Sequence, residues 1–145
     1  MQQTSEDNIR RINYLMTEID ALYHQAAVKM GLSDSVAYVL YTIYEAKGSC
    51  LLSEIYKKTG VSKQTINSAL RKLEQEGILY LEPYKGNAKK VILTSKGEQY
   101  VEQTVAKLYA AEIRSFASWS EAEMEMYISL IRKDIDSLRK EIERM

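Results

Sequence analysis

The fold of this chain is decided by residues 51–94, which read LLSEIYKKTGVSKQTINSALRKLEQEGILYLEPYKGNAKKVILT. Two short helical patterns meet at Thr59-Gly60, where Gly tolerates the positive φ that a tight reversal often needs. Two β-rich runs follow, and the Gly86-Asn87 pair between them is a hairpin turn signal. This order predicts two helices joined by a turn and followed by a β-hairpin.

Polar residues mark where these two helices begin and end. Ser53 is placed to cap the first helix, which runs through Lys58. Ser62 is placed to cap the second, which runs to Glu76 and stops at Gly77. Both helices are therefore short, as expected for a compact unit.

The hairpin is predicted from two apolar runs, 78–81 and 91–93. Pro83 suits the end of the first strand, because it has no N–H to donate to a neighbouring strand. We expect a wing-like hairpin beside the two helices.

The same region is basic within a neutral chain. Residues 51–96 hold nine Lys and Arg against four Asp and Glu, a net charge of +5, whereas the 145-residue chain holds 20 of each. The flanks are acidic, −2 for residues 1–50 and −3 for residues 97–145. A basic module between acidic helices favours a phosphate-facing middle, whereas the neutral charge of the whole chain argues against a generic polyanion binder.

Helices with a heptad-like apolar stripe are predicted at both ends of the chain. Gly31 ends the first of them, and Ser33 is placed to cap a second, mostly buried helix. The stripes, in steps of three and four, are Ile9, Ile12, Met16, Ile19, Tyr23, Ala26 and Met30, and Met124, Ile128, Ile131, Ile135, Leu138, Ile142 and Met145.

Two capping boxes are expected after the hairpin. Ser95 with Glu98 would open a long helix that continues to about Phe116, and Ser120 with Glu123 would open the last helix. The chain is then a mostly helical α+β protein of order α-α-α-α-β-β-α-α, with one short extra strand near the single cysteine.

The domain organisation follows from this order. We expect one chain, 1–145, in which a lobe over 33–97 carries the helices and the hairpin, and in which 6–31 and 98–145 form a helical region. Long helical arms of this kind need a partner surface to cover their apolar stripes.

The second helix of the lobe, 62–76, separates into two faces at 100° per residue. No acidic residue occurs from Ser62 to Leu73. A solvated helix face of this length would normally include Asp or Glu, so we interpret the outward face as one that reads bases in the major groove of double-stranded DNA: Arg can clamp guanine, Gln and Asn can clamp adenine, and Ser can adapt. The inward set is Ile66, Ala69, Leu70 and Leu73, and the outward set is Gln64, Ser68, Arg71 and Gln75, with Lys63 and Asn67 at one flank.

Lysines surround this helix and occupy the hairpin. We expect them to contact phosphates, although a solubilising role is an equally good interpretation of any single one. They are Lys57, Lys58, Lys72, Lys85, Lys89 and Lys90.

The ordered set of short motifs in this region resembles the MarR family of bacterial transcription regulators. The specific residues lie within 51–97, and the similarity in architecture extends over about 8–144. The motifs are Leu52-Ser53-Glu54-Ile55, Thr59-Gly60-Val61-Ser62-Lys63-Gln64-Thr65-Ile66, Leu73-Glu74-Gln75-Glu76-Gly77 and Leu93-Thr94-Ser95-Lys96-Gly97.

The resemblance implies a homodimer whose first and last helices interlock, with winged helix-turn-helix lobes that read two half-sites of a pseudo-palindrome. Repression relieved by a small molecule is the common pattern in the family. The implied DNA-contacting residues are Ser62, Lys63, Gln64, Thr65, Asn67, Ser68, Arg71, Lys72, Lys85, Asn87, Lys89 and Lys90. The implied dimer interface is Ile9, Ile12, Met16, Ile19, Ile128, Ile131, Ile135, Leu138 and Ile142.

The chain departs from the family at the tip of the wing. Members commonly have Asp-x-Arg there, with the Arg reaching into the minor groove, whereas this chain has Lys85-Gly86-Asn87. A Lys lacks the planar fork of Arg, and Asn87 has no charge. We therefore expect Lys89 and Lys90 to contact the DNA backbone rather than to read the minor groove.

Eleven tyrosines are many for this length. Tyr14, Tyr38, Tyr41 and Tyr109 fall on helices that surround an effector pocket in the resembling family. A ring with a hydroxyl suits a flat, aromatic effector. Core packing is the plainer explanation of tyrosines at helical spacing, and it is the one we favour.

Other functions lack the necessary residues. Cys50, in an apolar setting, is expected to be a buried, inert thiol, and one His leaves no cluster at metal-ligand spacing. The chain has no Gly-rich phosphate loop, G-x-S-x-G, H-E-x-x-H or C-x-x-C, so we expect neither an enzyme nor a cofactor. No membrane-length apolar run and no signal-peptide core are present, which favours the cytoplasm.

Two further hypotheses remain beside the DNA-binding regulator. A winged-helix protein-interaction module is favoured by the missing wing Arg and opposed by the acid-free helix and the basic lobe. A stand-alone helical scaffold leaves the basic hairpin unexplained. Salt dependence separates them, because phosphate-driven binding weakens steeply with salt.

Overall fold

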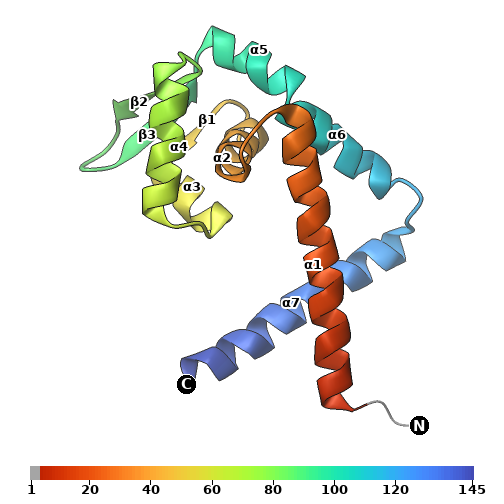
Figure 1. The fold of residues 1–145 in the computed structure, drawn as a ribbon. Helices are drawn as coiled ribbons and strands as arrows, with labels where there is room; N and C mark the ends of the chain where they lie inside the picture. Colours follow the sequence, from red (N-terminus) through yellow and green to blue (C-terminus); the bar gives the residue numbers. More distant parts are fainter. Residues whose placement is uncertain (1–3) are drawn as a thin grey trace. The chain divides into compact units, whose positions relative to one another are not determined.

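The computed structural model describes residues 4–145, and the first three residues, part of the segment in which no signal-peptide core was seen, lie outside it. The chain divides into two compact units, one extending to Tyr109 and one from Ala110 to Met145. The elements (Figure 1) are α1 Ser5–Met30, α2 Asp34–Glu45, β1 Ser49–Leu51, α3 Leu52–Thr59, α4 Lys63–Gln75, β2 Leu79–Pro83, β3 Lys89–Leu93, α5 Ser95–Gln103, α6 Val105–Ser115 and α7 Glu121–Glu143.

The predicted boundaries of the first two helices are confirmed. Gly31 has a φ of 71°, and its N–H donates to the carbonyls of Ala27 and Val28 at the end of α1. The side chain of Ser33 then accepts a hydrogen bond from the N–H of Val36 and caps α2. The left-handed conformation at position 31 is the reason that a glycine ends the first helix.

The helix-turn-helix is formed by α3 and α4. Gly60 has a φ of 64°, and Ser62 accepts from the N–H of Thr65, as predicted. The cap predicted at Ser53 is wrong: α3 begins at Leu52, directly after β1, and its N-cap residue Leu51 makes no side-chain cap hydrogen bond. The chain passes from strand to helix without an intervening loop, so the start of α3 is fixed by the pairing of β1.

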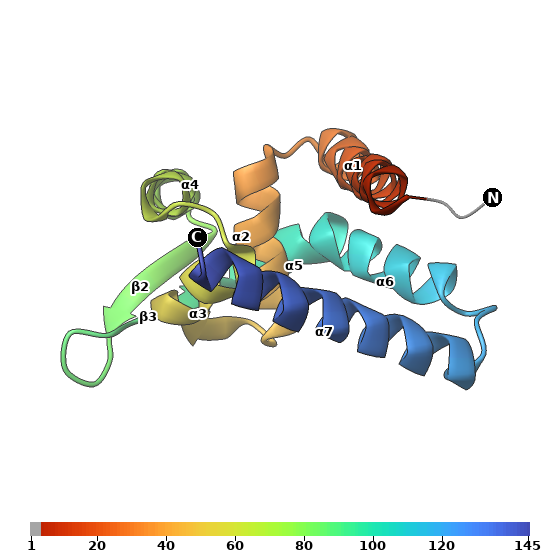
Figure 2. The ribbon, with the colours of Figure 1, turned by 90° about the horizontal axis from the view of Figure 1, so that it is seen from below.

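A three-stranded antiparallel sheet of order β1-β3-β2 completes the lobe. The extra strand expected near Cys50 is confirmed as β1, where Cys50 lies opposite Val91. Pro83 is the last residue of β2 and lies opposite Lys89, as its missing N–H suggested. Figure 2 shows the loop between β2 and β3 extending as a wing.

The core of the lobe lies between α2, α3, α4 and the sheet. Ile43, Ile55, Ile66 and Val91 are fully buried at its centre. Burying a side chain of this size stabilises the folded state by about 1.5–3 kcal/mol. The inward face predicted for α4 is confirmed, since Ile66, Ala69, Leu70 and Leu73 are its buried residues.

The long helix predicted from Ser95 to about Phe116 is in fact two helices. Thr104 breaks it with φ −125° and ψ −97°, and its hydroxyl donates to the carbonyl of Tyr100 at 2.8 Å. This local hydrogen bond holds the Thr104 side chain, which is buried, against the preceding turn. The predicted order, with its expected extra strand, thus gains one helix.

The cap of α5 also differs from the prediction. Thr94, not Ser95, is the N-cap, and its side chain accepts from the N–H of Gly97. Gly97 is required by close packing, because a Cβ at this position would lie 1.9 Å from the carbonyl oxygen of Ile78. The start of α5 is thus fixed against the end of the helix-turn-helix.

The capping box predicted for the last helix is confirmed. Ser120 accepts from the N–H of Glu123, and the N–H of Ser120 donates to the Glu123 carboxylate at 2.9 Å. This hydrogen bond lowers the pKa of Glu123 below its ordinary value. No residue of α7 is buried within the protomer, so its apolar stripe is exposed.

Candidate nucleic-acid interface

The outward face of α4 is the centre of the candidate interface. Every DNA-contacting residue predicted on this helix is exposed: Ser62, Lys63, Gln64, Thr65, Asn67, Ser68, Arg71 and Lys72. The first turn of α4 holds no acidic residue, which leaves the partial positive charge of its N-terminus uncompensated. The face therefore combines hydrogen-bonding side chains with positive potential.

The cations of this face and of the wing are available to an anion. Among residues 4–145, the ion pairs within 4.0 Å include neither Arg71 nor any lysine of α4 or of the wing. Lys58 on α3 differs, since its Nζ lies 3.8 Å from Glu45. Cations without a carboxylate partner can neutralise phosphates without first breaking an ion pair.

The wing carries the remaining predicted contacts. Lys85, Asn87 and Lys89 are exposed, and Lys90 is half-buried. Lys90 lies opposite Glu82 in the register of β2 and β3, whereas Lys89 lies opposite Pro83. The hairpin lies beside α4 and its loop extends beyond the helix in Figure 1 and Figure 2.

One residue of this surface was missed by sequence analysis. Tyr56 on α3 donates its hydroxyl to Oδ1 of Asn67 at 2.5 Å. The same ring lies beneath the ammonium of Lys63, with Nζ 5.3 Å from the ring centroid. The contact joins residues on two helices across the turn, and helical periodicity within either helix carries no signal for it.

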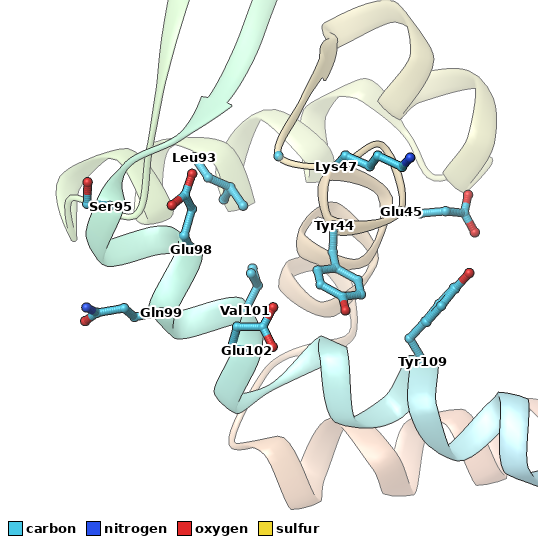
Figure 3. Close-up of a pocket in the computed structure, with 11 residues that line it drawn as sticks. Tyr44, Glu45, Lys47, Leu93, Ser95, Glu98, Gln99, Val101, Glu102 and Tyr109 are labelled. Carbon is cyan, nitrogen blue, oxygen red and sulfur yellow. The ribbon is translucent and has the colours of Figure 1, made fainter.

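A cavity of about 680 Å³ lies elsewhere in the same unit, between the end of α2, the sheet and α5 (Figure 3). Three carboxylates and one lysine give it an acidic character. It is lined by Tyr44, Glu45, Lys47, Gly48, Leu93, Ser95, Glu98, Gln99, Val101, Glu102 and Tyr109.

The tyrosines predicted around an effector are only partly gathered at this cavity. Tyr109 lines it, and its ring contacts those of Tyr44 and Tyr41 at centroid distances of 5.7 and 6.0 Å. Tyr14 and Tyr38 are exposed and do not line it. Tyr44, which was not among the predicted residues, lines it instead.

Cys50 and His24 have no arrangement suited to catalysis. Cys50 is buried, and the pKa of its thiol is raised to about 11, mainly by burial and also by the nearby Glu54, against a smaller opposing effect of Lys58. His24 Nδ1 lies 2.9 Å from Asp34 in an exposed pair. Over residues 4–145, no group of three or more His, Cys, Asp or Glu side chains could hold a metal ion. In the same residues, no helix has the length and apolar character needed to cross a membrane.

In the lobe, a turn joins α3 to the capped helix α4, and the β-wing follows. This arrangement defines a winged helix-turn-helix protein. Residues 30–89 match the model of the MarR family. This match agrees with the resemblance that the sequence motifs indicated.

Individual relatives agree in sequence and in fold. An uncharacterized HTH-type transcriptional regulator, YcgE of Bacillus subtilis (strain 168), is 24% identical over 127 residues, which cover 86% of this chain and 82% of that protein. NMB1585, a MarR family regulator from Neisseria meningitidis, has a similar fold with a TM-score of 0.84 at 16% identity, covering 94% of this chain and 97% of that one. The MepR of a S. aureus MepR–DNA complex has a TM-score of 0.65 at 21% identity, covering 94% and 99%.

Proposed function

We propose that this protein is a sequence-specific DNA-binding repressor that binds a pseudo-palindromic operator as a homodimer in the cytoplasm. The observation that carries this proposal is the outward face of α4, which is exposed, has no acidic residue from Ser62 to Leu73 and is supplied with Arg71 and Lys63. These side chains can donate to base edges in the major groove. The solved complex of MepR with DNA supports the proposal at the level of the fold.

The wing supplies the second contact. Lys85 and Lys89 are exposed without ion-pair partners among the described residues, and they lie on the hairpin beside α4. Without an Arg at the tip, the wing binds phosphates and contributes affinity rather than sequence preference.

The homodimer is supported by the apolar stripes at the two ends of the chain. Ile9 on α1 is 57% exposed and Ile142 on α7 is 56% exposed, and α7 buries none of its residues within the protomer. Exposed apolar stripes on two long helices are costly in water and are removed by pairing with a second copy. A dimer presents two α4 helices, which matches two half-sites.

An effector is proposed to bind in the cavity beside α5. Glu45, Glu98 and Glu102 outnumber Lys47 in its lining, and the rings of Tyr44 and Tyr109 are present (Figure 3). This lining favours a flat organic cation, because carboxylates attract the charge and the tyrosine faces stabilise it. Benzamidinium and benzoate, which have similar size and opposite charge, test this: we expect only benzamidinium to raise the Tm, and equal effects would contradict the assignment.

An alternative function is a protein-interaction module that has lost specific DNA binding. The observation that favours it is the wing tip, where Asn87 stands in place of the Arg of the family pattern. An apolar protein interface would be insensitive to salt, whereas contacts to several phosphates weaken steeply with it.

The decisive experiment is binding of the purified protein to its own upstream intergenic DNA over a salt series. Tight binding over random DNA with a steep salt slope supports the regulator. Equal, weak binding to both DNAs calls for a selection from random duplexes, and failure to enrich any sequence there would contradict specific DNA binding.

A further inference from the structure

We propose that Tyr56 is a positioning residue of the DNA interface, and that its hydrogen bond makes Asn67 read a guanine rather than an adenine. The inference rests on the proposed function, sequence-specific DNA binding. It adds Tyr56, a residue outside α4, to the residues that determine which operator sequence the protein prefers. It also changes the role expected for Asn67, whose amide was first interpreted as an adenine clamp.

The hydrogen bond engages one specific atom of the Asn67 amide. Asn67 Oδ1 is the only acceptor of the side chain, and Nδ2 carries its two donors. The Tyr56 hydroxyl donates to Oδ1 at 2.5 Å, a short distance for a hydrogen bond between two oxygens. One lone pair of Oδ1 is therefore engaged by Tyr56, whereas both N–H groups of Nδ2 remain to donate to DNA.

The atoms that remain free decide which base edge is matched. An adenine clamp needs Oδ1 to accept from N6 while Nδ2 donates to N7. With Oδ1 turned toward Tyr56, the N–H groups of Nδ2 are the main contacts that Asn67 can offer to a base. Guanine presents two acceptors, O6 and N7, in the major groove, and is the base that this donor pair matches best.

The side chain of Tyr56 is held in place by packing, and it can therefore position the side chains beside it. Its ring is half-buried and packs against the hydrophobic core of the lobe, which anchors α3 against α4. The ring also lies within cation–π distance of Lys63, with Nζ 5.3 Å from the centroid. Lys63 and Asn67 are four residues apart on α4 and share one side of the helix. One ring thus positions two side chains of the recognition face before DNA is bound.

The test begins with a selection from random duplexes by the wild-type protein. Affinities are then measured for variants of the enriched site that carry each of the four bases at each position. Tyr56→Phe keeps the ring, its packing and the contact with Lys63, and removes only the hydroxyl. We expect one position per half-site where wild type prefers guanine to adenine, and we expect Tyr56→Phe to lose this preference. The expected loss of affinity for the best site is about 3- to 10-fold, because one neutral hydrogen bond is removed.

A double-mutant cycle shows whether Tyr56→Phe acts by changing the position of Asn67 or only by destabilising the fold. If Tyr56 acts through Asn67, then Tyr56→Phe has no further effect in the Asn67→Ala background, while it keeps its effect in the Lys63→Ala background. Tyr100→Phe on α5, half-buried against the same core, is the matched control and should leave base preference unchanged. Thermal unfolding of each variant verifies that the fold is retained.

The outcomes test this inference separately from the proposed function on which it rests. A wild-type protein that enriches no sequence overturns both. A wild-type protein that enriches a site, with Tyr56→Phe showing the same affinity and base preference, overturns the role of Tyr56 alone. An additive effect of Tyr56→Phe and Asn67→Ala would also overturn it, because the two residues would then act independently.

Discussion

The hydroxyl of Thr94 donates to the carbonyl oxygen of Gly77 at 2.6 Å, and this contact joins the start of α5 to the end of the recognition helix. The same hydroxyl accepts from the N–H of Gly97, so it caps α5 while it donates to the carbonyl of Gly77, just beyond the end of α4. Lys96 Nζ adds a second link by donating to the carbonyl of Glu76 at 2.7 Å. The orientation of α4 is thereby coupled to the helix that lines the cavity.

Replacing Thr94 tests this junction. Thr94→Val keeps the shape and removes the hydroxyl, so both the cap and the hydrogen bond to Gly77 are lost. We expect the free energy of unfolding to fall by about 1–2 kcal/mol, measured by urea denaturation. Thr94→Ser retains the hydroxyl and should recover most of the loss; a Ser variant as unstable as the Val variant would show that the methyl group, not the hydroxyl, matters.

Most of the fold could be predicted from the sequence because its signals are local. The buried face of α4 follows from helical periodicity, and Gly31, Ser62 and the Ser120–Glu123 box act within a few residues of their own positions. Thr94 could not be recognised as the cap of α5, because Ser95 offers the same hydroxyl one residue later. What selects Thr94 includes its contact with Gly77, 17 residues away.

The candidate site, like the fold, could be predicted from the sequence only in part. The exposed side chains of α4 were predicted from the helical wheel, but the partner of Asn67 was not. Tyr56 and Asn67 are 11 residues apart on different helices, and their contact depends on how the turn at Gly60 sets the two axes. The cavity likewise depends on tertiary packing, so helical spacing could not show that Tyr44 lines it and Tyr14 does not.

Arg71 is expected to read a base. Arg71→Ala should weaken operator binding by about 1–3 kcal/mol and relax the preference at one base pair per half-site. Fluorescence anisotropy with single-base variants of the operator measures both effects. Arg114→Ala on α6, also exposed, is the matched loss of one arginine and should leave the base preference unchanged. Unchanged operator binding by the Arg71 variant would remove the assignment of this face.

Lys89 is expected to contact a phosphate rather than a base. Lys89→Ala should reduce the slope of log K against log salt by about one and leave sequence preference intact. A salt titration with operator DNA measures the slope, and Lys133→Ala on α7 controls for the loss of one positive charge. A shift in the preferred sequence of the Lys89 variant would show instead that the wing reads bases.

The dimer interface is tested on α7. Ile131 and Ile135 are 38% and 46% exposed in the protomer and lie one turn apart on the same stripe. Replacing both with Asp should dissociate the dimer, because pairing would bury two unpaired charges. Sedimentation velocity reports the result, with Lys133→Asp and Ser137→Asp on the same helix as controls. A dimer that persists in the Ile variant would place the interface elsewhere.

Cys50 is expected to make stability depend on alkaline pH. Burial raises its pKa from the ordinary 9.0 to about 11, so between these values the unfolded thiol loses its proton while the folded thiol keeps it. The unfolded state then binds fewer protons, and the free energy of unfolding falls as pH rises through this window. Urea denaturation at several pH values should therefore show that the free energy of unfolding falls more steeply with rising pH for wild type than for Cys50→Ala. Parallel curves would mean that Cys50 ionises equally in both states.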